Sequence, residues 1–130
     1  GDQLMKITLK GILILIFLLS SSTSFSEEGH FSKATKAQDN ARECAGAYAT
    51  EFEKAATITE LQDGALYSCD PLIESYATNI DLFLTFSAGM NYTQEYKDTY
   101  TMKYREKLKN ELRLIVADTA IRKRSARTKR

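Results

Sequence analysis

Two cysteines, Cys44 and Cys69, are the side chains of this sequence best suited to covalent chemistry. Their thiols could form a disulfide, take part in redox chemistry or bind a metal ion. The last two uses lack support, because there is no C-x-x-C pair and the single histidine is His30, near the start of the chain. An even number of cysteines in an exported chain favours a disulfide. We therefore expect a structural Cys44–Cys69 disulfide and no metal site.

Sequence motifs that carry catalysis are missing. The chain has no G-x-S-x-G, H-E-x-x-H, P-loop or G-x-G-x-x-G pattern. A catalytic cysteine would need a histidine partner, and His30 is not expected to be held in place. The carboxylates mostly occupy solvent-facing helix positions, and nothing singles out a pair for acid–base work. We expect no enzyme activity, no catalytic residue and no cofactor.

The first 26 residues have the pattern of an export signal. Residues 5–10 include two lysines, residues 11–19 are strongly apolar, and residues 20–26 are small and polar apart from one phenylalanine. The apolar run is shorter than the roughly 20 residues that a membrane span needs. We predict a signal peptide over residues 5–26, cleaved after Ser26, with a retained anchor as the alternative. Residues 1–4 are expected to be non-native or an upstream extension, and the protein to be periplasmic or secreted, with no membrane span after cleavage.

The elements that position the cysteines are two predicted helices. Apolar residues recur at steps of three and four on both sides of residue 57, which places them on one face of each helix. The first stripe comprises Ala37, Ala41, Cys44, Tyr48, Phe52 and Ala55, and the second comprises Ile58, Leu61, Ala65, Cys69, Leu72, Tyr76, Ile80 and Phe83.

A turn lies midway between the two cysteines. Thr57 with Glu60, and Thr59 with Gln62, both fit the capping box that starts a helix. One helix is therefore expected to end near residue 56 and the next to begin near residue 59. Residues equidistant from the turn of an antiparallel hairpin are neighbours, so the disulfide should link the two helices without distorting them.

The rest of the sequence continues the helical pattern. The second helix should run to about residue 88, with a kink or a restart at Asp70–Pro71, where the aspartate would be the N-cap. Asn91 or Thr93 should cap a third helix that ends near residue 122, and no alternating strand pattern competes. We predict an all-α fold, an antiparallel three-helix bundle with its first hairpin disulfide-linked. The bundle should cover residues 34–121, after a flexible N-terminus over residues 27–33 and before a basic, disordered tail over residues 122–130.

Four tyrosines, Tyr92, Tyr96, Tyr100 and Tyr104, recur every fourth residue of the third predicted helix. A row with this spacing spirals around a helix, so its members cannot all face one core. Either the tyrosines are half-buried with hydrated hydroxyls, or they form an aromatic strip that binds a partner, a peptide or a glycan.

The predicted tail is strongly basic, although the whole chain carries a net charge of only +1. Its cations are Arg122, Lys123, Arg124, Arg127, Lys129 and Arg130. Such an end is either solvated and disordered, or contacts anionic lipid, lipopolysaccharide or an acidic partner. Nucleic acid is not an expected partner, because export removes the chain from it and no global basic field attracts it.

The segment from Cys44 to Tyr76 resembles a loose class of small exported proteobacterial proteins of unknown function. In that class an Ala-rich helix with a cysteine is followed by a capped turn and a helix with a hydrophobic-x-x-x-Ala-Leu-x-x-Cys pattern, carried here by Leu61, Ala65, Leu66 and Cys69. The chain also looks superficially like the periplasmic acid-stress chaperones of the HdeA type, which are small, exported, all-helical and disulfide-bonded. It departs from them in its much shorter spacing between the cysteines.

These observations predict an interaction protein. We expect an exported helical binding module of the cell envelope, whose partner is an unknown protein or envelope component. The alternative is a periplasmic chaperone that responds to acid or stress. Low pH would protonate the acidic residues, leave the chain strongly cationic and expose apolar surface by opening the bundle.

Overall fold

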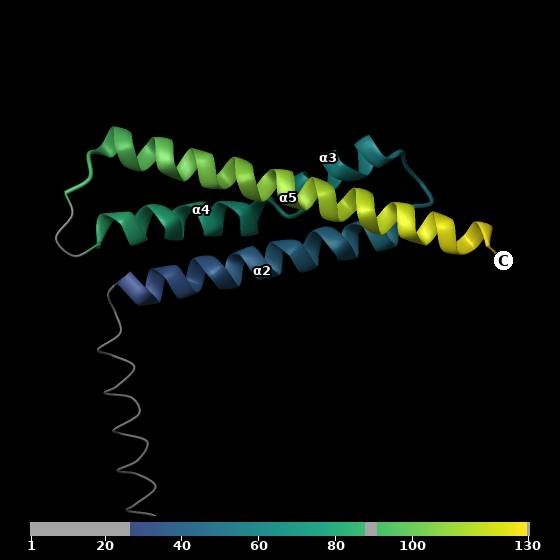
Figure 1. Ribbon diagram of the computed structural model, residues 1–130, viewed down its shortest axis with the longest axis horizontal. Coiled ribbons are helices and arrows are strands. Elements are labelled where there is room, and N and C mark those ends of the chain that lie inside the picture. The colour runs from purple at the N-terminus through teal and green to yellow at the C-terminus, as the bar shows by residue number, and fades with distance from the viewer. Residues whose placement is uncertain (1–26, 88–90, 130) are drawn as a thin grey trace, which may run out of the picture.

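Residues 27–87 and 91–129 form an all-α structure in the computed structural model, with no strand among them. The helices are α2 (Glu27–Phe52), α3 (Ile58–Ser68), α4 (Asp70–Thr85) and α5 (Gln94–Thr128). The predictions for residues 1–26, for the helix end near residue 88 and for Arg130 lie outside the residues that the structure describes. In Figure 1, α2 and α5 run in the same direction, and α3 and α4 run in the opposite direction, with α4 between α2 and α5.

The disulfide is present and joins α2 to the junction of α3 and α4. Cys44 and Cys69 are bonded, and their Cα atoms are 6.0 Å apart. The turn between the helices lies where the capping pattern predicts it: the Thr57 hydroxyl accepts a hydrogen bond from the Glu60 amide at 3.2 Å, and the Glu60 carboxylate accepts one from the Thr57 amide at 3.3 Å. The predicted pairing and the predicted turn are both confirmed.

The second predicted helix is two helices, so the described residues form four helices rather than three. Cys69 separates α3 from α4 and is itself the N-cap of α4, with no side-chain capping bond, whereas Asp70 lies in the first turn. Pro71 follows directly. Because proline has no amide hydrogen and its ring clashes with the preceding turn, a continuous helix through residue 71 is disfavoured.

Alanines form the buried face of α2. The residues with almost no exposed surface are Ala34, Ala37, Ala41, Ala45 and Ala49. The predicted stripe is wrong beyond Ala41, since Cys44 and Tyr48 are only partly buried and Phe52 is exposed. The spacing of the buried residues from Ala37 onward is four rather than mixed three and four, which rotates the buried face away from Phe52.

The other two rows of the core also follow steps of four and carry larger side chains. On α3 and α4 the row contains Leu61, Ala65, Cys69, Ile73 and Ala77, and on α5 it contains Leu108, Leu112, Val116 and Ala120. Small alanines on one helix facing leucine, isoleucine and valine on the others allow dense packing at short helix separations. Ridges of residues four apart favour helices that cross, and α5 lies obliquely to α2 in Figure 1.

Both ends of the predicted domain extend further than the sequence suggests. The prediction of a flexible segment over residues 27–33 is wrong, because α2 begins at Glu27 and Ala34 is already buried. The prediction of a disordered tail over residues 122–130 is wrong for residues 122–128, which continue α5. Contacts with the residues just after α2, described below, hold this last part of α5 in place.

Candidate interaction surfaces

The four tyrosines form a continuous stack along the first turns of α5. Ring centroids are 4.7 Å apart for Tyr92 and Tyr96, 5.9 Å for Tyr96 and Tyr100, and 4.6 Å for Tyr100 and Tyr104. Tyr96 is 46% exposed, whereas the other three are partly buried against the core. The stack ends at Lys107, whose Nζ lies 5.2 Å from the Tyr104 ring centroid. Most of the faces of these rings are therefore occupied by one another, as expected for aromatic pairs.

A hydrogen bond inside the stack changes the acidity of one tyrosine. The Tyr100 hydroxyl donates to the Tyr104 hydroxyl at 3.0 Å. This hydrogen bond, together with partial desolvation and the neighbouring phenols, raises the pKa of Tyr100 to about 12. The stack is thus a structural unit with its own internal bonding as well as a surface.

A second aromatic group lies at the same end of the molecule, where α2 begins and α4 ends. The His30 ring stacks on Phe86 with centroids 5.5 Å apart, and Phe31 contacts Phe83 at 5.6 Å. Phe31 and Phe86 are each 56% exposed. We use the name aromatic end for the surface formed by His30, Phe31, Phe83, Phe86, Tyr92, Tyr96 and Tyr100.

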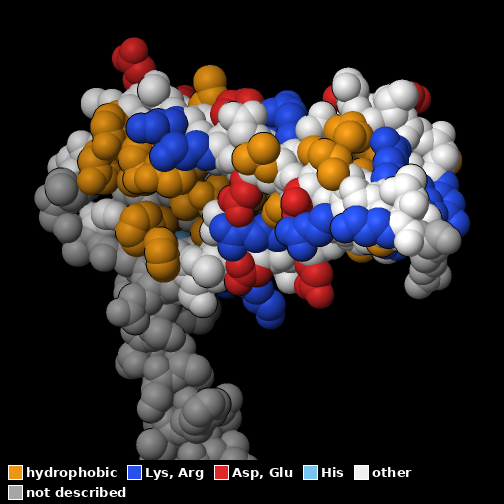
Figure 2. All heavy atoms as spheres, turned by 45° about the vertical axis from the view of Figure 1, so that its right-hand side comes forward, with side chains coloured by type: hydrophobic (Ala, Val, Ile, Leu, Met, Phe, Trp, Pro, Cys, Tyr) orange, Lys and Arg blue, Asp and Glu red, His pale blue; other side chains and the backbone are white. Residues whose placement is uncertain are grey.

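The aromatic end is an exposed apolar surface built from three helices. Figure 2 shows hydrophobic side chains gathered at the end of the molecule where α2 begins, while most of the basic side chains in this view lie on the other half. Sequence reasoning predicted the tyrosines but missed His30, Phe31 and Phe86. These residues are far apart in the sequence and come together only when α2 packs against α4, so no local sequence pattern indicates the cluster.

Two arginines of the basic C-terminal segment bond to other parts of the protein and are not available to a partner. Glu53, just after α2, is 2% exposed and accepts hydrogen bonds from both terminal guanidinium nitrogens of Arg127, with Nη2 to Oε2 at 2.8 Å. The Arg124 guanidinium donates to the carbonyl oxygens of Glu53 and Ala56 at 2.7 and 2.6 Å. Cations at a helix C-terminus satisfy carbonyls that lack partners within the helix. Arg124 and Arg127 are therefore structural.

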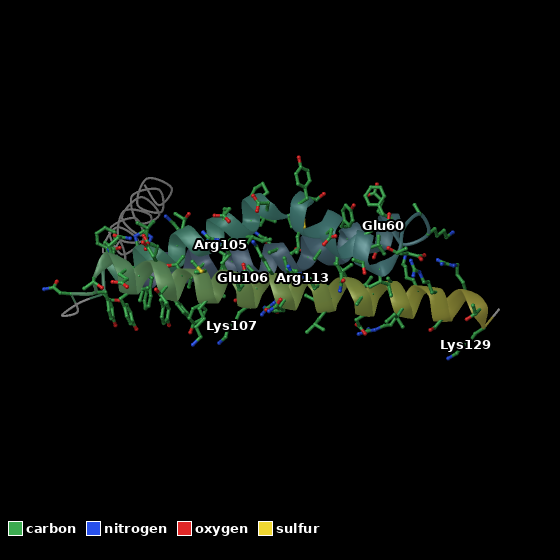
Figure 3. The ribbon with its side chains drawn as sticks, turned by 90° about the horizontal axis from the view of Figure 1, so that it is seen from above. Glu60, Arg105, Glu106, Lys107, Arg113 and Lys129 are labelled. Carbon is green, nitrogen blue, oxygen red and sulfur yellow. A yellow bond between two sulfur atoms is a disulfide. The ribbon has the colours of Figure 1, made fainter. Side chains whose placement is uncertain are left out.

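Three further cations of this segment, Arg122, Lys123 and Lys129, face solvent. Arg122 pairs with Asp118 one turn earlier on α5. Lys123 lines a shallow hollow of about 290 Å³ together with Lys54 and Arg127. Figure 3 shows Lys129 pointing away from the helices at the far end of α5. Three of the predicted contact residues, Arg122, Lys123 and Lys129, thus stay available to a partner.

The described residues contain neither a cluster of metal-binding side chains nor a membrane-spanning helix. Over residues 27–87 and 91–129 there is no group of three or more histidine, cysteine, aspartate or glutamate side chains placed to hold a metal ion. None of the four described helices is long and apolar enough to cross a membrane. Both described cysteines are in the disulfide, so neither offers a thiol.

Comparison with protein-family models, with curated proteins and with solved structures finds no match to this chain. The geometry of its own residues is therefore the basis for assigning a function.

Proposed function

We propose that this protein is an exported helical binding module that performs no catalysis and contacts a protein or another envelope component through its aromatic end. The observation that carries the proposal is the exposure of Phe31 on α2, Phe86 at the C-cap of α4 and Tyr96 on α5, all at one end of the molecule. Large exposed apolar groups cost solvation free energy and are typical of interaction surfaces when they cluster. Aromatic residues are also the residues that contribute most to binding energy at interfaces.

Export is the second part of the proposal. The charged, apolar and small-residue regions of residues 5–26 favour a cleaved signal peptide. The Cys44–Cys69 disulfide supports a location outside the reducing cytoplasm. In that compartment the protein would act as a bundle of three helical segments: α2, α3 followed by α4, and α5. Mass spectrometry of the protein isolated from its source should find Glu27 at the amino terminus and no thiol that an alkylating reagent can label.

The solvent-facing cations form a secondary surface in this proposal. Arg122, Lys123 and Lys129, with Lys54 nearby, offer positive charge at the end opposite to the aromatic end. They would assist binding to an acidic partner or to anionic lipid, at a strength that falls with salt concentration. Nucleic acid is not a proposed partner.

Site-specific photo-crosslinking tests the binding surface. A photoreactive residue replaces Phe86 in one variant and Tyr67, which is 86% exposed on α3, in the other. We expect a saturable adduct with envelope fractions from Phe86 and none of the same mass from Tyr67. Excess unlabelled protein should compete for the adduct.

Competition by variants keeps the test specific. A competitor with Phe31→Ser, Phe86→Ser and Tyr96→Ser should fail to displace the adduct, and a competitor with Leu114→Ser and Ile121→Ser should still displace it. The control pair removes two large exposed apolar side chains of α5 outside the aromatic end. Equal competition by both would contradict the assignment of the surface.

An acid-responsive chaperone is the second candidate, favoured by the burial of Glu53 between two arginines. Loss of this negative charge would remove the anion that holds the end of α5 to the segment after α2 and would free apolar surface. In acid, at about pH 2 to 4, where exposed carboxylates become protonated, the protein should then suppress aggregation of a client protein, and a Glu53→Gln variant, which lacks the charge at every pH, should do so at higher pH. No suppression at any pH removes this candidate.

A further inference from the structure

A groove between α4 and α5 contains polar atoms that the protein itself leaves without partners. It has a volume of about 490 Å³ and is lined by Ala77, Thr78, Asp81, Asp98, Thr101, Met102 and Arg105. Thr101 is only 8% exposed, and its hydroxyl has no hydrogen-bond partner. The buried Nε of Arg105 has none either. Unpartnered buried donors cost free energy and point to a ligand or water that satisfies them.

The arginine is held in place by a different atom. Arg105 Nη2 donates to Glu74 on α4 at 3.0 Å, which fixes the guanidinium across the groove. Figure 3 shows Arg105 directed toward the other helices and the nearby Lys107 directed away from them. The Nε–H of Arg105 is thus positioned and has no hydrogen-bond partner, but it has almost no exposed surface, so a ligand reaches it only after a covering side chain shifts. Because this group can only donate, the ligand atom that it meets must be an acceptor.

Two carboxylates supply the opposite charge. Asp81 of α4 and Asp98 of α5 line the groove, and neither forms an ion pair with a cation of the described residues. Asp98 is oriented by a hydrogen bond from Gln94 at 2.8 Å. Because Glu74 already neutralises Arg105, the net charge of the lining favours a cationic group near the aspartates.

The order of these groups along the groove sets the shape of the ligand. On α5, Asp98 lies about 4.5 Å along the helix axis from Thr101, and Thr101 lies about 6 Å from Arg105. A cation at the aspartates and an oxygen at the threonine are therefore close neighbours, with the arginine within reach of the same oxygen. Ala77 and Met102 add apolar surface beside them.

We propose that this groove binds a molecule that has a primary ammonium group on one carbon and a carbonyl or carboxylate oxygen on the next carbon. The ammonium would lie between Asp81 and Asp98, and the oxygen would accept hydrogen bonds from the Thr101 hydroxyl and Arg105 Nε. Free α-amino acids and the amino-terminal residue of a peptide share this chemistry. The site is distinct from the aromatic end and does not depend on the proposed function.

Isothermal titration of the disulfide-bonded protein with three probes tests the inference. L-Leucine carries the ammonium and a carboxylate, L-leucinamide carries the ammonium and an amide carbonyl, and N-acetyl-L-leucine lacks the ammonium. We expect saturable binding of at least one of the first two and none of the third. Tighter binding of leucinamide identifies a peptide amino terminus as the ligand, and binding of leucine at least as tight as leucinamide identifies a free amino acid.

Variants assign the contacts. Asp98→Asn and Thr101→Val should each weaken binding tenfold or more, because each removes a partner of a charged or buried group. Thr101→Ser keeps the hydroxyl and should retain binding, which separates a direct contact from a loss of folding. Asp118→Asn, an exposed change further along α5, is the matched control. The inference is overturned if neither leucine nor leucinamide binds, if N-acetyl-leucine binds equally well, or if Asp98→Asn and Thr101→Val leave the affinity unchanged.

Discussion

Arg127 donates hydrogen bonds from Nη1 and Nη2 to the two oxygens of the buried Glu53 carboxylate, across a separation of 74 residues in the sequence. Arg124 strengthens the same junction by donating to the carbonyl oxygens of Glu53 and Ala56. A bidentate arginine–carboxylate pair is directional as well as strong. Arg124 and Arg127 therefore hold α5 against the segment that follows α2. We call this junction of Glu53, Ala56, Arg124 and Arg127 the clasp.

The clasp should contribute measurably to stability. Replacing Glu53 by glutamine keeps the size of the side chain and one acceptor oxygen but removes the charge. We expect Glu53→Gln to lower the free energy of unfolding by about 2 kcal/mol, in the range for hydrogen bonds to charged groups. Urea denaturation at neutral pH measures the change.

An exposed ion pair of the same helix provides the control. Asp118 and Arg122 pair on the surface of α5, with both side chains more than half exposed. Surface pairs contribute between zero and about 1 kcal/mol. A stability loss for Asp118→Asn equal to that for Glu53→Gln would show that burial of Glu53 confers no special role.

Local signals in the sequence predicted the features that depend on neighbouring residues. The Thr57–Glu60 capping box and the Thr93 cap of α5 involve residues three apart, and both are present. The pairing of Cys44 with Cys69 followed from their equal distances from the turn. Each of these needs only a helix, a turn and counting along the chain.

Features that depend on packing between distant helices could not be predicted in this way. The alanine row of α2 lies inside because larger residues of α4 and α5 cover it. Alanine is common in protein cores, but burial of its single methyl group contributes little free energy, so the row does not by itself determine which face of the helix is buried. The role of Arg124 depends on the turn after α2, because its partner Ala56 in that turn is 68 residues away in the sequence. The aromatic end likewise exists only after α2 and α4 bring Phe31 to Phe83.

A close approach between α2 and α3 predicts opposite effects for two similar substitutions. A Cβ atom at Gly64 would lie 2.6 Å from Tyr48 Cζ, whereas one at Gly46 would lie 3.9 Å from the nearest side-chain atom, Ile115 Cγ2. Alanine is favoured over glycine in a helix by about 1 kcal/mol. Gly46→Ala should therefore stabilise the protein, and Gly64→Ala should destabilise it because the Tyr48 ring must move.

A double-mutant cycle identifies the cause. In a Tyr48→Ala background the space at residue 64 is free, so Gly64→Ala should become stabilising by up to about 1 kcal/mol. Thermal and urea unfolding of the four proteins give the coupling between the two positions. An unchanged effect of Gly64→Ala in both backgrounds would show that the ring does not restrict the site.

The tyrosine stack should make stability depend on alkaline pH. The pKa of Tyr100 is raised from 10.0 to about 12, chiefly by its hydrogen bond to Tyr104, so the folded state holds this proton more tightly than the unfolded state does. The corresponding stabilisation is fully present below pH 10 and is lost as the pH rises toward 12.

Removal of the Tyr100 hydroxyl should remove the contribution of this residue to the loss of stability at alkaline pH. We expect Tyr100→Phe to lose less stability than the unmodified protein between pH 10 and 12, as measured by urea unfolding at several pH values. Tyr67→Phe is the control, because Tyr67 is almost fully exposed on α3. Burial also raises the pKa of Tyr76, so part of the alkaline loss should persist in both variants. Identical profiles for Tyr100→Phe and Tyr67→Phe would contradict the assignment to the stack.

The disulfide should be the largest single stabilising bond of the fold. It closes a loop of 25 residues that contains the end of α2, the turn and all of α3. In the chain-entropy model, a crosslink of this span contributes about 3 kcal/mol by restricting the unfolded chain. Replacing both Cys44 and Cys69 by serine should therefore lower the melting temperature by about 15 °C in a domain of this size.

Reduction separates the bond from the side-chain change. A reducing agent should lower the melting temperature of the natural protein to near that of the double-serine variant and should leave the variant unaffected. Because Cys69 is buried and is also the N-cap of α4, local packing at the α3–α4 junction should respond to the substitution as well. A natural protein whose melting temperature is insensitive to reduction, with both thiols then labelled by an alkylating reagent, would mean that helix packing alone holds the hairpin closed.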